Sequence, residues 1–286
     1  MTDEAHPAVG ASLRDRKVSC LMVSLPVPQR WPFFLRSVDA YCRQTHPNRE
    51  LVIVLNQGAA EVRAAARAHL ALLGRDDIRV VERAGQCSLG ALRNVSLDSA
   101  RGEFVCQWDD DDLHHPQRVE RQLAALVASG AEGSCLEEII QYFPATRALH
   151  CINFRATAAK AMPGSLTCRR AAPIRYPESG PESRLGEDSV VAAQLARAGG
   201  LHAFAGAPHL FVYVSHGANT WPDDHHRMLA RELSVSSGLL RRREAQLRAG
   251  LAPFDFGPGE VAVHGYNGVA FTLGAASASA ISTQSR

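Results

Sequence analysis

Short apolar runs and segments with helical spacing alternate along the first 108 residues. The apolar runs cover residues 18–25, 51–55, 78–81 and 103–108, and the helix-patterned segments lie between them. An apolar run without polar alternation is typical of a strand that a parallel sheet buries on both faces. We therefore expect an α/β protein with a Rossmann-like, doubly wound, mostly parallel sheet that binds its ligands at the carboxyl ends of the strands.

Three loops should meet at that edge of the sheet. They follow three of the apolar runs and cover residues 26–30, 56–58 and 109–112. The last of them is a run of four aspartates, Asp109 to Asp112, whose carboxylates repel one another. A divalent cation would offset that repulsion, and oxygen ligands favour Mg²⁺ or Mn²⁺. An acidic turn that caps the start of a helix is the alternative explanation.

The second half of the chain has a less regular pattern. We expect a helix at 117–128, a strand at 135–143, an irregular region at 148–186, a helix at 188–198, a strand at 210–214 and one charged amphipathic helix at 227–248. Beyond residue 249 the periodicity is weak and the last dozen residues are mostly small and polar, so we expect partial disorder there.

The composition is that of an ordinary globular protein. Of 286 residues, 46% are hydrophobic, and 31 Lys and Arg against 29 Asp and Glu leave a net charge of +2. No basic block interleaved with aromatic residues is present, so nucleic acid is not the expected partner. The seven cysteines are scattered and form no CxxC pair, which favours a reducing compartment. Without a signal-peptide pattern or about 18 unbroken apolar residues, we expect a cytoplasmic protein with no transmembrane segment.

A set of separated motifs occurs in one order along residues 17–222. They are a strand ending at Pro26, then QTHPNRELVIVLN, LGALRNVSLDSARGEFVCQWDDDDLHHPQR, LGEDSVVAAQL and HGANTW. Each motif alone is weak, but the set resembles the family 2 glycosyltransferases. The resemblance implies a GT-A fold and an inverting enzyme that depends on a nucleotide-sugar.

This resemblance also implies how the chain is divided. A flexible segment, 1–16, would precede a GT-A domain at 17–248, and a partly disordered extension would follow at 249–286. Within the domain, residues 17–116 would bind the nucleotide-sugar, 117–222 would form the acceptor and catalytic half with its irregular region, and 223–248 would form the C-terminal amphipathic helix.

In this family an acidic DxD site holds a divalent cation against the diphosphate of the donor. Asp109 and Asp111 match its first and last positions, and Asp111 is the expected direct ligand. Asp110 would face the ribose, although a small rotation of the loop would exchange these roles. His216 matches the C-terminal histidine that completes the metal site, and an imidazole ligand favours Mn²⁺ over Mg²⁺. A lone histidine is also often an ordinary polar residue.

The nucleotide would be bound by residues from three loops or helices. Asn56 stands where the family has a base-recognising aspartate, and its amide still offers a donor and an acceptor to a uracil. A plain turn at Asn56 is the alternative. The loop at Pro26 lies beside it, and Arg93 offers a forked cation to a phosphate or to the acidic loop.

Asp188 and Glu187 match the family's ED motif. An inverting transfer needs one carboxylate to take the proton from the acceptor hydroxyl as it attacks the anomeric carbon. Asp188 is the expected base, and Glu187 would orient the acceptor or the loop. For an isolated pair, acidic capping of the helix that follows would be the simpler explanation.

The resulting hypothesis is a metal-dependent transferase that moves a sugar from a UDP-sugar to a carbohydrate or other hydroxyl-bearing acceptor. The resemblance adds bacterial polysaccharide or glycoconjugate synthesis as the setting. A nucleotidyltransferase is one rival, but no Gly-rich phosphate loop with a Lys follows the first strand. A degenerate nucleotide- or carbohydrate-binding module is the other. The helix at 227–248 leaves packing on its own domain, a homo-oligomer and peripheral membrane contact open.

Overall fold

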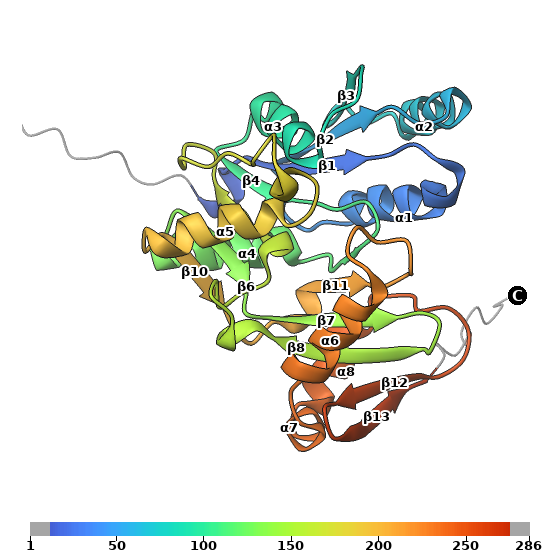
Figure 1. Ribbon diagram of the computed structural model, residues 1–286, viewed down its shortest axis with the longest axis vertical. Coiled ribbons are helices and arrows are strands. Elements are labelled where there is room, and N and C mark those ends of the chain that lie inside the picture. The colour runs from blue at the N-terminus through green and yellow to red at the C-terminus, as the bar shows by residue number, and fades with distance from the viewer. Residues whose placement is uncertain (1–11, 275–286) are drawn as a thin grey trace, which may run out of the picture.

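The computed structural model of the protein describes residues 12–274. Residues 1–11 of the expected N-terminal segment and residues 275–286 of the expected C-terminal extension lie outside the described part. The described chain forms two sheets with helices packed on them, and Figure 1 shows the second sheet below the first.

The first sheet has seven strands in the described part of the chain. Their spatial order is β10 (Leu201–Phe204), β6 (Gly133–Leu136), β9 (Thr167–Arg169), β4 (Phe104–Gln107), β1 (Val18–Ser24), β2 (Arg49–Asn56) and β3 (Ile78–Arg83). Strand β9 is antiparallel to both of its neighbours, and the other neighbouring pairs are parallel. The predicted α/β class with a mostly parallel sheet is confirmed.

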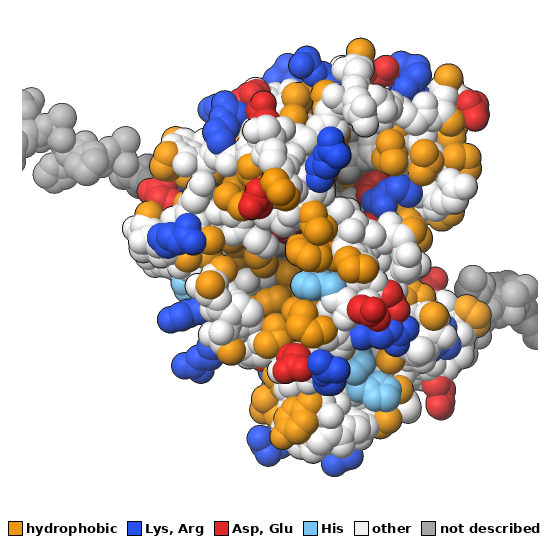
Figure 2. All heavy atoms as spheres, viewed as in Figure 1, with side chains coloured by type: hydrophobic (Ala, Val, Ile, Leu, Met, Phe, Trp, Pro, Cys, Tyr) orange, Lys and Arg blue, Asp and Glu red, His pale blue; other side chains and the backbone are white. Residues whose placement is uncertain are grey.

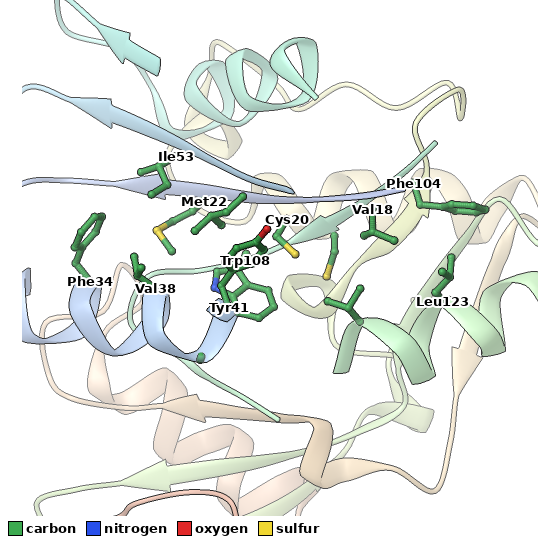
Figure 3. Close-up of a cluster of buried hydrophobic side chains, with 14 of the residues drawn as sticks. Val18, Cys20, Met22, Phe34, Val38, Tyr41, Ile53, Phe104, Trp108 and Leu123 are labelled. Atoms are coloured by element: carbon green, nitrogen blue, oxygen red, sulfur yellow. The ribbon is translucent and has the colours of Figure 1, made fainter. Parts of the chain in front are cut away.

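Helices cover both faces of this sheet. One face packs against α1 (Trp31–Cys42), α2 (Ala60–Leu73) and α4 (Arg118–Ser129), and the other packs against α3 (Leu89–Ser99) and α5 (Glu187–Arg197). Figure 3 shows the first of these cores, where Met22 of β1, Phe34 of α1 and the indole of Trp108 meet. Strand β1 is buried along almost its whole length because both faces are covered, which explains its unbroken apolar sequence.

The second sheet was not expected from the sequence. Its strands are β13 (Gly268–Leu273), β12 (Val261–Gly265), β8 (Ala148–Asn153), β7 (Glu138–Phe143), β11 (Phe211–Val214) and β5 (Leu113–His114). Helices α7 (Ser237–Arg242) and α8 (Glu244–Leu251) pack on one face and α6 (Asp223–Leu233) on the other. The β12–β13 hairpin adds to this sheet from a region where the sequence shows only weak periodicity.

The prediction of one strand at 135–143 is wrong. Residues 133–136 form β6 in the first sheet and residues 138–143 form β7 in the second. At Glu137 the backbone N–H donates to Phe204 O at 3.0 Å, and the carbonyl accepts from Phe154 N–H at 2.8 Å. One of these bonds ties Glu137 to β10 of the first sheet, and the other ties it to the residue that follows β8 of the second sheet. Two glutamates, Glu137 and Glu138, stand at this point between the two apolar runs.

The prediction of one helix at 227–248 is also wrong, since α6, α7 and α8 replace it. The chain leaves α6 at Ser234, which has an extended ψ of 140°. Ser236 then caps α7 by accepting a hydrogen bond from Leu239 N–H at 3.2 Å. Serine competes with helical hydrogen bonds in this way and favours a helix start. The region at 148–186 is not wholly irregular either, because it contains β8 and β9.

A span across a membrane would need a long, apolar helix. Within residues 12–274, none of the helices combines the necessary length with the necessary hydropathy.

Candidate functional site

The four aspartates form the crossing from the first sheet to the second. They follow β4 and lead directly into β5, which pairs antiparallel with β11. Trp108 anchors the start of this crossing: its backbone N–H donates to Leu21 O at 3.0 Å, and its indole Nε1 donates to Ser37 Oγ at 2.9 Å. Its side chain is fully buried. The acidic loop is therefore fixed at both ends.

The four carboxylates differ in exposure: two are almost fully buried and two are partly exposed. Asp110 and Asp112 are 2% and 1% exposed. Asp110 accepts from Ser24 Oγ at 2.5 Å, and Asp112 accepts from Val214 N–H at 3.0 Å. The side chains of Asp109 and Asp111 are 23% and 14% exposed. Asp109 and Asp111 are thus the more accessible pair, which are the positions expected for DxD ligands.

Two arginines offset the acidic charge. Arg30, at the end of the 3₁₀ turn Pro28–Arg30 after β1, pairs with Asp110 and lies 3.0 Å from Asp111 Oδ2. Burial raises the pKa of Asp110 to about 6, and the neighbouring Asp111 charge adds to the shift, whereas Arg30 opposes it. Arg93, on α3, places Nη1 3.0 Å from Asp109 Oδ1. The acidic run therefore does not depend on a metal alone for charge compensation.

His216 joins the site through Asp111. It lies in the turn after β11, where its backbone N–H donates to Asn219 Oδ1 at 2.9 Å. Its Nε2 lies 3.1 Å from Asp111 Oδ2, and Phe33 packs on its ring with centroids 4.5 Å apart. Burial opposes ionisation of Asp111, but the hydrogen bond from His216 and the charge of Arg30 bring its pKa below the usual value.

A preassembled metal cage is not found within the described residues: no three His, Cys, Asp or Glu side chains there already converge as a group that could hold a metal ion. The structure brings Asp111 and His216 together. Asp109, the other expected ligand, is held by Arg93 and also accepts from Gln107 Nε2 at 3.1 Å.

The ED pair begins α5, across the cavity from the acidic run. Glu187 is 3% exposed and accepts from Arg93 Nε at 2.7 Å. Arg93 therefore joins Glu187 to Asp109. Of the two partners that the sequence offered Arg93, a phosphate or the acidic loop, the structure shows the acidic loop. Asp188 has its Oδ1 bound to Ser189 N–H at 2.7 Å. Burial raises the pKa of Asp188 to about 6, and the neighbouring Glu187 charge adds to the effect.

One cavity of about 520 Å³ connects most of these groups, but His216 is not among its lining residues. Of the expected site residues, those that line it are Arg93, Asp109, Asp110, Asp111, Glu187 and Asp188.

Pro26 and Asn56 do not line this cavity. Asn56 donates through Nδ2 to Arg83 O and to Gly85 O, both at 3.1 Å, so its amide closes the loop beside it. Pro26 O accepts from Ala59 N–H at 2.9 Å, and this bond holds the first two strand-end loops together.

Arg30 is the main site residue that sequence reasoning missed. A signal for it was present, because it lies in the loop at 26–30, which the sequence already placed beside the acidic run. Arg30 is the cationic residue of that loop, and its place near four carboxylates was enough to predict an ion pair with them. The many apolar side chains of the cavity were missed as well, and they come from separate segments that carry no common motif.

Known proteins are similar to this chain in sequence and in fold. Residues 23–150 match the family described as glycosyl transferase family 2. An uncharacterized glycosyltransferase of Rickettsia bellii is 32% identical over 115 residues, which are 39% of this chain and 15% of that protein. The chain therefore matches only a small part of this relative's length.

Two solved structures share the fold. S. aureus TarS, in a crystal structure of 1–349 with UDP, is 15% identical and superposes with a TM-score of 0.54, covering 83% of this chain and 70% of that one. The mannosyltransferase PcManGT from Pyrobaculum calidifontis, in complex with GDP-Man and Mn²⁺, is 18% identical with a TM-score of 0.54, covering 87% and 67%. The fold is GT-A, and residues 23–150 of the chain are similar to glycosyl transferase family 2.

Proposed function

We propose that the protein is a metal-dependent, inverting glycosyltransferase that moves a sugar from a nucleoside diphosphate sugar to an acceptor hydroxyl. A UDP-sugar is the proposed donor, and bacterial polysaccharide or glycoconjugate synthesis is the proposed setting. The observation that carries this proposal is that one cavity holds the accessible carboxylates of Asp109 and Asp111 together with the raised-pKa carboxyl of Asp188. A transferase needs both groups, one for the leaving diphosphate and one for the attacking hydroxyl.

The donor atoms at the acidic loop fit a divalent cation. His216 Nε2 lies 3.1 Å from Asp111 Oδ2, and Asp109 lines the cavity together with Asp111. These three residues would hold Mn²⁺ or Mg²⁺, and the imidazole favours Mn²⁺. Such ions leave positions for substrate phosphates, so a complete protein cage is not required. When bound, the cation supplies a Lewis acid for the charge of the leaving diphosphate.

Asp188 is the proposed general base. Its carboxylate takes the proton from the acceptor hydroxyl while the new bond to the anomeric carbon forms and the bond to the diphosphate breaks. The apolar surroundings that raise its pKa to about 6 make it a better proton acceptor than an exposed aspartate. Glu187 is the proposed partner that fixes this helix start, because Arg93 ties it to Asp109.

The nucleotide is proposed to lie along the strand-end loops of β1 and β2. Asn56 would offer its Oδ1 to a uracil N–H, because its Nδ2 already donates to Arg83 O and Gly85 O. Pro26 would line the same loop, and Asp110 would face the ribose. Arg93 is close enough to the acidic loop to meet a phosphate there. UDP in the TarS structure and GDP-Man with Mn²⁺ in the PcManGT structure support a nucleotide-sugar donor for this fold.

Calorimetric titration tests the donor side of this proposal. UDP and GDP are titrated with Mn²⁺ and again with EDTA, against wild type and Asp111→Ala. We expect metal-dependent UDP binding that Asp111→Ala loses. Arg227→Met is the control, because Arg227 lies in an exposed ion pair of α6 and does not line the cavity. No binding of either nucleotide by the wild type would refute the proposal.

Asp188→Asn tests the base. We expect transfer to fall by about 10² to 10⁴, the contribution typical of a general base, while UDP binding is retained. An equal loss of binding and transfer would contradict the assigned role. Intact UDP binding by the wild type without turnover on any acceptor would instead favour a binding module.

A further inference from the structure

The cavity has two chemically different sides. The side formed by the acidic loop and α3 carries charged groups: Arg30, Arg93 and the aspartates. The opposite side is built by β7, the segment between β8 and β9, and α6 with the turn before it. Its apolar side chains, here called the apolar wall, are Ile139, Phe154, Ala161, Met162, Trp221 and Leu229. Figure 2 shows hydrophobic side chains gathered in the hollow between the two sheets.

The apolar wall begins at the proposed base. A Cβ placed on Gly164 would lie 3.4 Å from Asp188 Oδ2 and 3.4 Å from the terminal methyl of Met162. The carboxylate and the methyl group therefore border the same small space. Trp221 reaches the start of α5 in the same way, because its Cζ2 would lie 3.5 Å from a Cβ on Gly186. A molecule that presents a hydroxyl to Asp188 from the side of Gly164 would lie beside Met162 of this wall.

Gln141 and His226 on this side each use an N–H in an internal bond, whereas Gln141 Oε1 and His226 Nδ1 have no hydrogen-bond partner. Gln141 donates through Nε2 to Ser215 Oγ at 2.9 Å, and His226 Nε2 lies 3.1 Å from Trp221 O. Trp221 itself stacks on His225, with ring centroids 4.3 Å apart and planes 20° apart. The wall thus presents a flat aromatic surface and aliphatic groups more than hydrogen-bond donors.

We infer that the acceptor is a hydroxyl-bearing molecule with an apolar body, an alkyl or aryl aglycone, which packs against the apolar wall while its hydroxyl faces Asp188. This inference rests on the proposed transferase function and names its acceptor class. The donor is not expected to fill this wall, because its uracil is proposed to lie at the loops of β1 and β2 and its sugar and diphosphate are polar. A polysaccharide chain would bring many hydroxyls against the wall and lose their hydrogen bonds to water.

The acceptor class predicts a preference among matched substrates. Free hexoses are compared with their octyl and phenyl glycosides, each below its micelle-forming concentration, using radiolabelled UDP-sugars. We expect the glycosides to have KM values at least about tenfold lower than the free hexoses, because filling an apolar pocket discriminates by about 10- to 200-fold. Equal or better use of the free hexoses would overturn the inference.

Two neighbouring residues of α6 provide a matched pair of variants. Leu229 lines the cavity, whereas Met228 is 37% exposed and does not. Leu229→Gln should raise KM for the octyl or phenyl glycoside about tenfold, and Met228→Gln should change it less than about twofold. Equal KM changes in both variants would contradict the inference. Retained UDP binding in the calorimeter shows that each variant is folded.

The outcomes separate this inference from the function on which it rests. If the wild type binds no nucleotide, the proposed transferase function fails. If it binds UDP and uses only free sugars or oligosaccharides, the function stands and the apolar acceptor is wrong. UDP binding without transfer to any glycoside of the panel also counts against the apolar acceptor.

Discussion

Replacement of Arg93 by Met should destabilise the protein severely. The Arg93 side chain is 9% exposed, and its Nε lies 2.7 Å from an oxygen of Glu187, whose side chain is 4% exposed. Met keeps much of the aliphatic length but removes the charge. The carboxylate of Glu187 would then stay buried without its counter-charge. Asp109 would lose its partner too, but its side chain is 23% exposed and reaches water.

The magnitude follows from the burial of this ion pair. Removing one partner of a buried pair costs about 3–5 kcal/mol, because the other charge remains desolvated and unpaired. For a domain of about this size, 1 kcal/mol corresponds to about 2–4 °C in Tm, so Tm should fall by about 6–20 °C. An exposed pair behaves differently. Arg227→Met breaks the pair of Arg227 with Asp223, whose side chains are 58% and 44% exposed, and should cost only about 0.3–0.5 kcal/mol.

Thermal and denaturant unfolding, followed by circular dichroism, measure these differences. The double variant Arg93→Met with Glu187→Gln completes the comparison, because it removes the orphaned charge. It should recover most of the lost stability, since the large penalty belongs to the unpaired charge and not to the lost pair. A loss below about 1 kcal/mol in Arg93→Met, or no recovery in the double variant, would refute this reasoning.

Three further perturbations have defined outcomes. Gly90→Ala should lower stability by at least about 1–3 kcal/mol in a denaturant melt, because its Cβ would lie 1.9 Å from Pro177 O; Gly238→Ala, in α7 with open space around it, should instead gain about 0.5–1 kcal/mol. A pH profile of kcat/KM should rise up to a pH near 6 and then level off. Asp188 acts as a base only when deprotonated, and burial raises its pKa to about 6. An acid limb near pH 4 would exclude Asp188 as the general base. His216→Ala should weaken Mn²⁺-dependent UDP binding about tenfold or more in calorimetry, and unchanged binding would remove it from the proposed metal site.

Much of the first sheet was predictable because its signals are local. Strands β1, β2 and β4 read as unbroken apolar runs, since helices cover both of their faces. The second sheet was not predictable in this way. Most of β6 and all of β7 were predicted as one strand at 135–143, and their pairing with different neighbours separates them. Strand pairing is a long-range property, and a residue pattern does not record the partner.

The sequence by itself determined that four carboxylates end a strand of a mostly parallel sheet, because four adjacent charges exclude a strand interior and leave only its end. Tertiary structure decided which of them stay accessible to solvent. Backbone anchors at Trp108 and at the β5–β11 pair orient the crossing, so Asp110 and Asp112 turn inward. It also decided the charge pairing with Arg30 and Arg93 and assembled the apolar wall from separate segments. Those features depend on packing between residues that are far apart in the chain. That packing sets the free energy of burial and the free energy of charge pairing.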